Sequence, residues 1–300
     1  MPGDDVDAIC PEADRLRRDA DKKLKSFNLF SSASKRQLEA ADLYARAANK
    51  YRVAKLWDEA GETHLLAAKN FELSSNDDWV DARKNYEEGA KCLAKCKPEE
   101  AIDAYKSAAL LCLKENSFSM AAHNYKAMGE LCEEEDLDLE IAIDAFRRAA
   151  DCYEAADAVR NQLDMILKVA LFSAKSEQYE QAIESYSKVI SASLKGATRS
   201  SGELAAFNCV LCHLAWRDST TDKAESVFDE YKDYFDNWAK SVNGKLLEDI
   251  FDAIHKADPD KWDKAVTQAD SRSTLSAFHK SLLAQAQKNK LESLAELDLT

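Results

Sequence analysis

The segment EAIDAYKSAALLC, residues 100–112, contains the pattern that decides the fold of this 300-residue chain. A small residue and its neighbour are followed three to four positions later by an aromatic side chain, and then by a pair of small residues. Residues three and four apart lie on one face of an α-helix. The segment therefore predicts a helix that packs closely on its neighbours through alanine.

The same pattern recurs along much of the chain. It is found in EAADLYARAANKY (39–51), EAGETHLLAAKNF (59–71), DARKNYEEGAKCL (81–93), MAAHNYKAMGELC (120–132), IAIDAFRRAADCY (141–153) and QAIESYSKVISAS (181–193). Successive helices start about 19 to 22 residues apart, so pairs of helices repeat near 40 residues, which indicates a helical-hairpin solenoid. We expect its core to contain the aromatic residues of the pattern, Tyr44, Tyr86, Tyr105, Tyr125, Phe146 and Tyr186.

The chain contains 7 glycines and 4 prolines, too few to punctuate a β-rich fold, and this favours an all-α class. The alanine pattern fades after about residue 195. We predict a tetratricopeptide-like α-solenoid (twisted helical sheet) over residues 1–235 and a helical bundle with an acidic tail over 236–300. The bundle would close the open end of the stack, as solenoids require.

Charge and terminal sequence limit the class of partner and the compartment. The formal net charge of −14 argues against nucleic acid as a partner, because such binding needs a basic surface. The N-terminus has no apolar run of the signal-peptide kind, and no segment reaches the ~18 apolar residues of a membrane span. We expect a cytoplasmic protein whose eight cysteines are reduced.

No motif predicts an enzyme, a cofactor or a metal site. The string CVLCH (209–213) has the form of a haem attachment site, and Cys92 and Cys96 share a helix face, but both fall on the small-residue stripe. No further zinc ligands lie near Cys92 and Cys96. The sequence has no glycine-rich phosphate loop, nucleophile elbow or zinc-protease helix. We interpret the chain as a binding protein.

One apolar cluster lies outside the repeats. In KKLKSFNLFSSASKRQ (22–37), Phe27, Leu29 and Phe30 occupy a serine-rich gap between lysines. Three interpretations are open: the cluster folds back onto its own domain, it docks on a partner protein, or it enters a membrane surface beside its lysines.

Several stretches resemble the α/β type of the soluble NSF attachment protein (SNAP) family of membrane-fusion adaptors, nearly end to end. They are YARAANKYRVAKLWDEAG (44–61), FSMAAHNYKAMGELCEEE (118–135), ILKVALFSAKSEQYEQAIESYSKV (166–189), LCHL (211–214) and the terminal LDLT. The resemblance implies a cytoplasmic adaptor, peripheral on membranes, that binds the four-helix bundle of assembled SNARE complexes. It would recruit and stimulate the hexameric ATPase NSF, which disassembles the SNAREs in vesicle trafficking.

The resemblance also implies three groups of site residues. The membrane-contact group, in a loop at 26–36, is Lys25, Phe27, Leu29 and Phe30. The SNARE-binding group is Arg52, Lys55, Lys91, Lys95, Lys97, Lys126 and Lys168. The NSF-binding group is Glu248, Asp249, Asp252, Asp298 and Leu299.

The chain departs from the family pattern where basic residues are expected, because Ser117, His123 and Asp164 stand there instead. In the acidic run after Asp252, His255 and Lys256 replace acids. Two alternatives to the adaptor therefore remain: a divergent SNAP with weakened SNARE binding, or a tetratricopeptide-like scaffold for another protein.

Overall fold

The computed structural model describes residues 4–26, 32–74, 78–196 and 199–292, and their side chains except those of 4–9, 199 and 292. The helices are α1 (Asp4–Lys25), α2 (Ala33–Val53), α3 (Trp57–Ser74), α4 (Trp79–Leu93), α5 (Pro98–Lys114), α6 (Phe118–Glu134), α7 (Leu139–Ala155), α8 (Val159–Lys175), α9 (Tyr179–Leu194), α10 (Arg199–Ala215), α11 (Thr221–Tyr234), α12 (Val242–His255), α13 (Pro259–Arg272) and α14 (Ala277–Gln287). Short helical turns follow at η2 (Trp238–Lys240) and η3 (Lys288–Glu292). The described residues contain no strand, which confirms the predicted all-α class.

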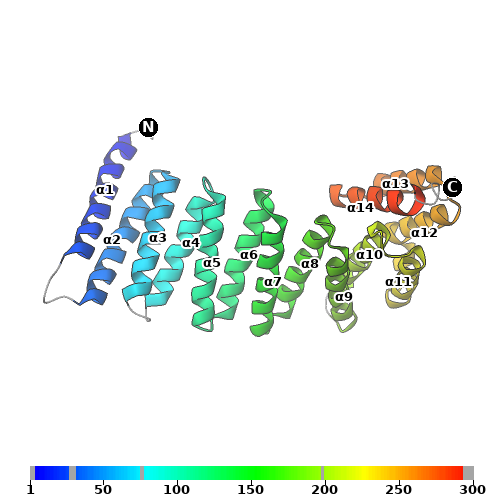
Figure 1. The fold of residues 1–300 in the computed structure, drawn as a ribbon, viewed down its shortest axis with the longest axis horizontal. Coiled ribbons are helices and arrows are strands. Elements are labelled where there is room, and N and C mark those ends of the chain that lie inside the picture. Colours follow the sequence, from blue (N-terminus) through cyan, green and yellow to red (C-terminus); the bar gives the residue numbers. More distant parts are fainter. Residues whose placement is uncertain (1–3, 27–31, 75–77, 197–198, 293–300) are drawn as a thin grey trace. The chain divides into compact units, whose positions relative to one another are not determined.

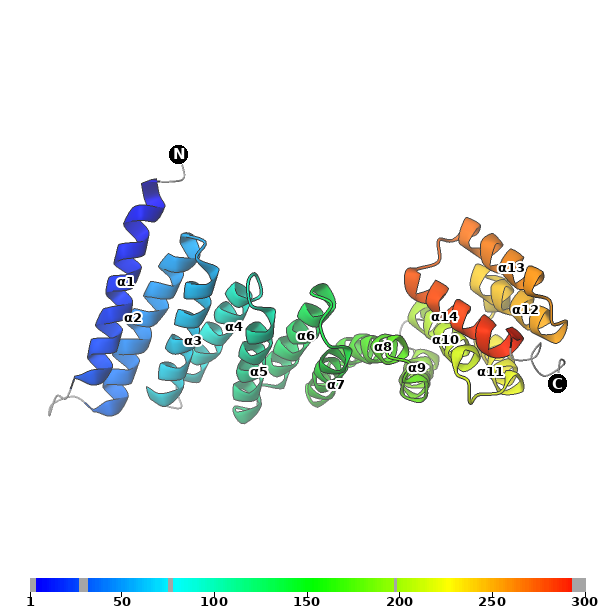
Figure 2. The ribbon, with the colours of Figure 1, turned by 45° about the horizontal axis from the view of Figure 1, so that its top comes forward.

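The chain divides into two compact units, Met1–Gln162 and Leu163–Thr300, and the division falls within α8. In the first unit, α1 to α7 lie side by side in chain order, each packed on its neighbours (Figures 1 and 2). In the second unit, α9 pairs with α10 as a hairpin, and α10 also contacts α11 and α14. The domain boundary predicted at 235/236 follows the repeat pattern rather than contacts, and it stays a prediction.

Small residues bring the helices of the first unit together. The alanine pairs at 40–41, 47–48, 67–68, 108–109 and 121–122 have no exposed surface. On α3, a Cβ added to Gly61 would lie 2.5 Å from Cγ of Leu93 on α4. On α6, a Cβ added to Gly129 would lie 2.7 Å from the ring of Phe146 on α7. These two glycines are required because the neighbouring helix leaves no room for a side chain.

Five of the six aromatic residues expected in the core are buried: Tyr44, Tyr86, Tyr125, Phe146 and Tyr186. Tyr105 is only partly buried, so its assignment to the core was wrong. Burial raises the pKa of its hydroxyl, and the carboxylates of Glu87 and Glu88 raise it further. Tyr105 is therefore at the boundary between the apolar core and a charged surface.

Within the part of the chain that the structure describes, six helices end in a turn in which the residue after a left-handed position donates its N–H to the carbonyl five residues earlier. In the first, Leu56 N–H donates to Tyr51 O, and Lys55 N–H donates to Arg52 O, both at 3.0 Å. This is the Schellman motif, in which one residue adopts a left-handed conformation. The left-handed residue, usually glycine in other proteins, is here Lys55, Asn116, Asp136, Asp157, Glu177 or Ala257, with φ between 48° and 60°. These are therefore strained turns built without glycine.

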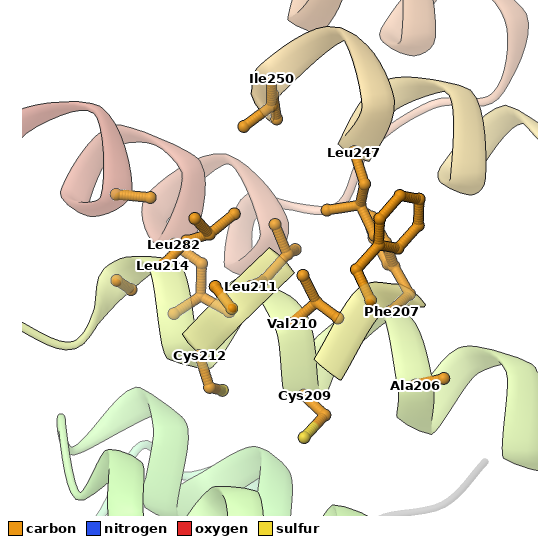
Figure 3. Close-up of a cluster of buried hydrophobic side chains, with 14 of the residues drawn as sticks. Ala206, Phe207, Cys209, Val210, Leu211, Cys212, Leu214, Leu247, Ile250 and Leu282 are labelled. Atoms are coloured by element: carbon orange, nitrogen blue, oxygen red, sulfur yellow. The ribbon is translucent and has the colours of Figure 1, made fainter. Parts of the chain in front are cut away.

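The core of the second unit is organised around α10. Phe207, Cys209, Val210, Leu211, Cys212 and Leu214 have no exposed surface. Figure 3 shows Leu247 and Ile250 of α12 and Leu282 of α14 around this segment. A helix that is apolar on all sides lies inside its domain, and the cysteines of CVLCH belong to that packing. The interpretation of Cys209 and Cys212 as packing residues is confirmed.

We predict that Gly129→Ala lowers the free energy of unfolding by about 1 to 3 kcal/mol, because Phe146 is fully buried and has little space to move. Urea unfolding followed by circular dichroism measures the change. As a control, Phe146→Leu should make the same Gly129→Ala substitution less destabilising in the double mutant. Equal effects of Gly129→Ala in both backgrounds would show that this contact does not limit helix spacing.

Candidate functional site

Five of the basic residues expected to bind SNAREs gather at one edge of the first unit. Arg52 and Lys55 lie where α2 ends, and Lys91, Lys95 and Lys97 lie where α4 ends. The turns after α2 and α4 lie on the same side of the stack because successive helices alternate in direction (Figure 1). We call Arg52, Lys55, Lys91, Lys95 and Lys97 the basic edge.

The side chain of Glu88 on α4 joins two members of the basic edge. Its carboxylate lies 3.0 Å from the Arg52 guanidinium and 2.7 Å from the Lys91 ammonium. Burial opposes ionisation of Glu88, but the hydrogen bond and charge of Lys91, together with Arg52, hold its pKa below the usual value. Glu88 is thus ionised near neutral pH, and Arg52 and Lys91 are partly neutralised within the molecule.

Lys97 is more fully compensated by acidic side chains. Its ammonium lies 2.6 Å from Asp58, 3.4 Å from Glu62 and 3.7 Å from Glu100. The hydrogen bond to Asp58 is the main reason that the pKa of Lys97 is raised. A partner's carboxylate would have to compete with three acids for this ammonium.

Lys95 and Lys55 have no ion pair within the described residues. The Lys95 ammonium lies 3.6 Å from the centre of the Trp57 ring, a cation–π contact that leaves its charge uncompensated. Lys55 is exposed in the left-handed position of its turn. These two lysines of the basic edge can therefore bind an acidic partner protein without first breaking an ion pair within the molecule.

The remaining basic predictions do not join this edge. Lys126, in the middle of α6, lies 3.5 Å from Glu130 one turn later. Lys168 lies on α8 in the second unit, where its side chain is partly buried and has its own interactions. His123 and Asp164, which stand where basic residues were expected, are both exposed.

The acidic residues expected to bind NSF lie on α12 in the second unit. Glu248 and Asp249 are exposed. Asp252 is paired instead, 2.9 Å from Lys256 and also in contact with Lys261. His255 Nε2 lies 3.2 Å from the carboxylate of Glu225 on α11. The two residues that replace family acids therefore pair with acids of this chain, and sequence reasoning did not predict the role of Lys261.

Phe27, Leu29 and Phe30 lie outside the described residues, as do Asp298 and Leu299. Lys25 is exposed at the last position of α1. On the other side of the loop, the Ser32 hydroxyl caps α2 by accepting from Lys35 N–H at 3.1 Å. Lys23 of α1 and Glu39 of α2 form an ion pair at 2.6 Å. The loop therefore begins and ends at helix termini that are tied together.

Metal binding and thiol reactivity depend on how histidine, cysteine and acidic side chains are grouped and buried. The described residues contain no group of three or more histidine, cysteine or acidic side chains that could hold a metal ion. Burial raises the pKa of the Cys209 thiol to about 11, and the Cys212 thiol is shifted in the same direction. Such thiols are poor nucleophiles and poor haem-attachment sites at neutral pH. Within the same residues, no helix is both long and apolar enough to cross a membrane.

Comparison with known proteins gives consistent matches over nearly the whole chain. The family model described as soluble NSF attachment protein, SNAP, matches residues 11–291. The α-soluble NSF attachment protein of Vitis vinifera is 32% identical over 96% of this chain and 97% of its own length. The human α-soluble NSF attachment protein is 28% identical, with coverages of 92% and 94%. A probable vesicular-fusion protein sec17 homologue of Schizosaccharomyces pombe is 28% identical, with coverages of 96% and 99%.

Among solved structures, a Pyrococcus horikoshii signal-transduction ATPase with a tetratricopeptide repeat sensor aligns with a TM-score of 0.41 and 15% identity. That alignment covers 99% of this chain and 43% of the other, and its score is too low to support an inference. The identification therefore depends on the family model and the curated relatives, whose members are attachment proteins of vesicle fusion and not enzymes. This chain belongs to the soluble NSF attachment protein family.

Proposed function

We propose that this protein is an adaptor that binds assembled SNARE complexes and recruits and stimulates NSF for their disassembly. The observation that carries the proposal is the match to the SNAP family over residues 11–291. The charges of the two units support it. The first unit carries the basic edge, suited to an acidic coiled coil, and the second carries exposed acids at Glu248 and Asp249, suited to a basic ATPase domain.

Reconstitution tests the proposal directly. The pure protein is mixed with NSF, ATP and a preformed SNARE complex, and disassembly is followed in time. We expect disassembly to depend on the protein and on ATP hydrolysis. SNARE complexes that stay assembled under these conditions, with NSF shown active beside a known attachment protein, would overturn the proposal.

We further propose that the 27–30 cluster contacts the membrane. The exposed Lys25 and the paired ends of α1 and α2 support this, because they fix the two ends of a loop with three apolar residues. A few inserted side chains give weak binding, which nearby lysines increase on anionic lipid by about 1 kcal/mol each.

One alternative is supported by specific observations. A divergent SNAP with weakened SNARE binding is favoured by the three acids around Lys97 and by the exposed Asp164. Salt dependence separates the two possibilities. A family member with an effective basic edge loses affinity steeply as salt rises, whereas a weakened one binds poorly at all salt concentrations.

We predict that Lys55→Glu weakens SNARE-complex binding about fivefold at low salt, because it replaces an uncompensated positive charge by a negative one. Lys55→Gly removes the charge and relieves the left-handed backbone, so it should lose some binding while the protein stays equally or more stable. Lys69→Glu, at an exposed position of α3, is the charge-matched control. Binding that changes as much in Lys69→Glu as in Lys55→Glu would remove the basic edge from the proposal.

We predict that Phe27→Ser with Phe30→Ser lowers binding to anionic liposomes about tenfold, since each inserted phenylalanine contributes roughly 1.5 kcal/mol or less when partly buried. Liposome co-flotation measures the effect, and helix content and melting temperature serve as controls. A double mutant that floats like the parent contradicts membrane contact. A large drop in melting temperature would favour the fold-back interpretation instead.

We predict that Glu248→Lys with Asp249→Lys weakens NSF recruitment, whereas Leu299→Ala leaves recruitment and SNARE binding nearly unchanged and lowers stimulated ATP turnover. Glu248 and Asp249 are chosen because Asp252 is already paired with Lys256 and Lys261, so replacing Asp252 would also release two lysines beside the acidic surface. NSF pull-down and ATPase assays separate the two effects. Full stimulation by the Leu299→Ala protein would assign the stimulating role to α12 alone.

A further inference from the structure

Lys290 is a lysine in an unusual place, because only 7% of its surface is exposed. Lysines are almost never this buried unless a partner compensates the charge. The Lys290 ammonium donates to the backbone carbonyl of Trp216 at 2.9 Å and to that of Ser219. Both carbonyls are more than 70 residues away in the sequence, so the contact joins two distant parts of the second unit.

Its neighbour Asn289 makes a parallel contact. The side-chain N–H of Asn289 donates to the carbonyl of Ala215 at 2.5 Å. Ala215 is the last residue of α10, and Trp216 follows it directly. The last carbonyls of a helix lack donors within the helix, and a positive charge placed beside them is favourable. Asn289 and Lys290 together therefore cap the C-terminal end of α10; we call these two residues the clamp.

The turn that receives the clamp is itself fixed. His213 Nδ1 and the Ser219 hydroxyl lie 3.0 Å apart, and both residues are buried. Burial, with the charges of Lys223 and Lys290, lowers the pKa of His213 to about 4. Its imidazole is thus neutral near pH 7. Burial also lowers the pKa of the Lys290 ammonium, and the nearby carboxylate of Asp218 opposes that shift.

The clamp is formed by an irregular piece of helix. Residues Lys288–Glu292 form a π-helical turn directly after α14. Such turns are rare in proteins, and many of those that occur lie at functional sites. Leu291 on the same turn is 5% exposed and belongs to the core around α10. The π-helical turn is therefore held by one apolar side chain, Leu291, and by three hydrogen bonds from Asn289 and Lys290, and the C-terminal segment 293–300 follows it.

We infer that Asn289 and Lys290 are positioning residues for the C-terminal segment, because they fix the point at which residues 293–300 begin. This inference rests on the proposed function, in which Leu299 of that segment stimulates NSF. The eight residues from Leu291 to Leu299 can span about 29 Å at most. A connection this short keeps Leu299 at a high effective concentration near NSF only while its starting point at Glu292 stays fixed. If the clamp opens, that starting point moves and the effective concentration of Leu299 falls.

Two variants and one control test the clamp. Lys290→Met keeps the length and apolar stem of the side chain but removes the ammonium, and Asn289→Ala removes the other donor with less disturbance of the core. Lys288→Met changes an exposed lysine of the same turn. In a fourth protein, ten Gly and Ser residues inserted after Glu292 leave the clamp intact and lengthen the connection to Leu299.

Two measurements are made on each full-length protein. Hydrogen exchange of amides in residues 277–292 reports opening of the clamp, which we expect to be about tenfold faster in Lys290→Met and unchanged in Lys288→Met. NSF titrations report the half-saturating concentration and the maximal ATP turnover separately. We expect both clamp variants and the insertion to keep the half-saturating concentration and lose most of the maximal stimulation.

The outcomes are distinguishable. Maximal stimulation that stays at the parent level in both clamp variants and in the insertion overturns the inference while the proposed function stands. A parallel loss of SNARE binding, recruitment and stimulation together with a lowered melting temperature would show a structural role only, and this also overturns it. A parent protein that does not stimulate NSF refutes the proposed function and the inference with it, and the exchange data then test the cap on α10 alone.

Discussion

The structure depends on the close approach of neighbouring helix backbones, which alanine and glycine make possible. Gly61 faces Leu93 with no room for a methyl group, and Gly129 faces the ring of Phe146 in the same way. Because each helix of the first unit packs on its chain neighbours, its turns fall at the two edges of the stack. The charged residues at the ends of α2 and α4 are brought together by this spacing, although about 40 residues separate them in sequence.

The helices and most of the core could be predicted from the sequence, because a period of three to four residues is a local property of the chain. Tyr105 fits that period and is still only partly buried, since the pattern identifies a face but not how completely a neighbour covers it. The pairing of Lys97 with Asp58 and Glu62 had no local signal, because both acids lie on α3, 35 or more residues earlier in the chain. Lys290 was missed for a related reason: a lysine near the end of a polar segment predicts exposure, and only the position of α10 buries it.

Charge in this molecule is largely arranged in pairs. Glu88 lies between Arg52 and Lys91, and Lys256 and Lys261 lie beside Asp252. A residue that departs from the family pattern, such as Lys256, is therefore not simply a lost acid, because it also neutralises a neighbouring one. Exposed pairs of this kind contribute little to stability. They do determine which charges remain available to a partner, and the net charge of −14 conveys nothing about that distribution.

The left-handed turns have a consequence for the thermodynamics of the unfolded chain. A residue with a side chain in this conformation is strained by roughly 1 kcal/mol or more, but the same side chain restricts the unfolded ensemble, which glycine would widen. Six such turns are spread from Lys55 to Ala257, and effects at distant sites usually add. Apart from the turn at Lys55, none of these residues belongs to a proposed binding surface. The stability of the fold can thus drift upward or downward in small independent steps over evolution while the core and the binding surfaces keep their sequence.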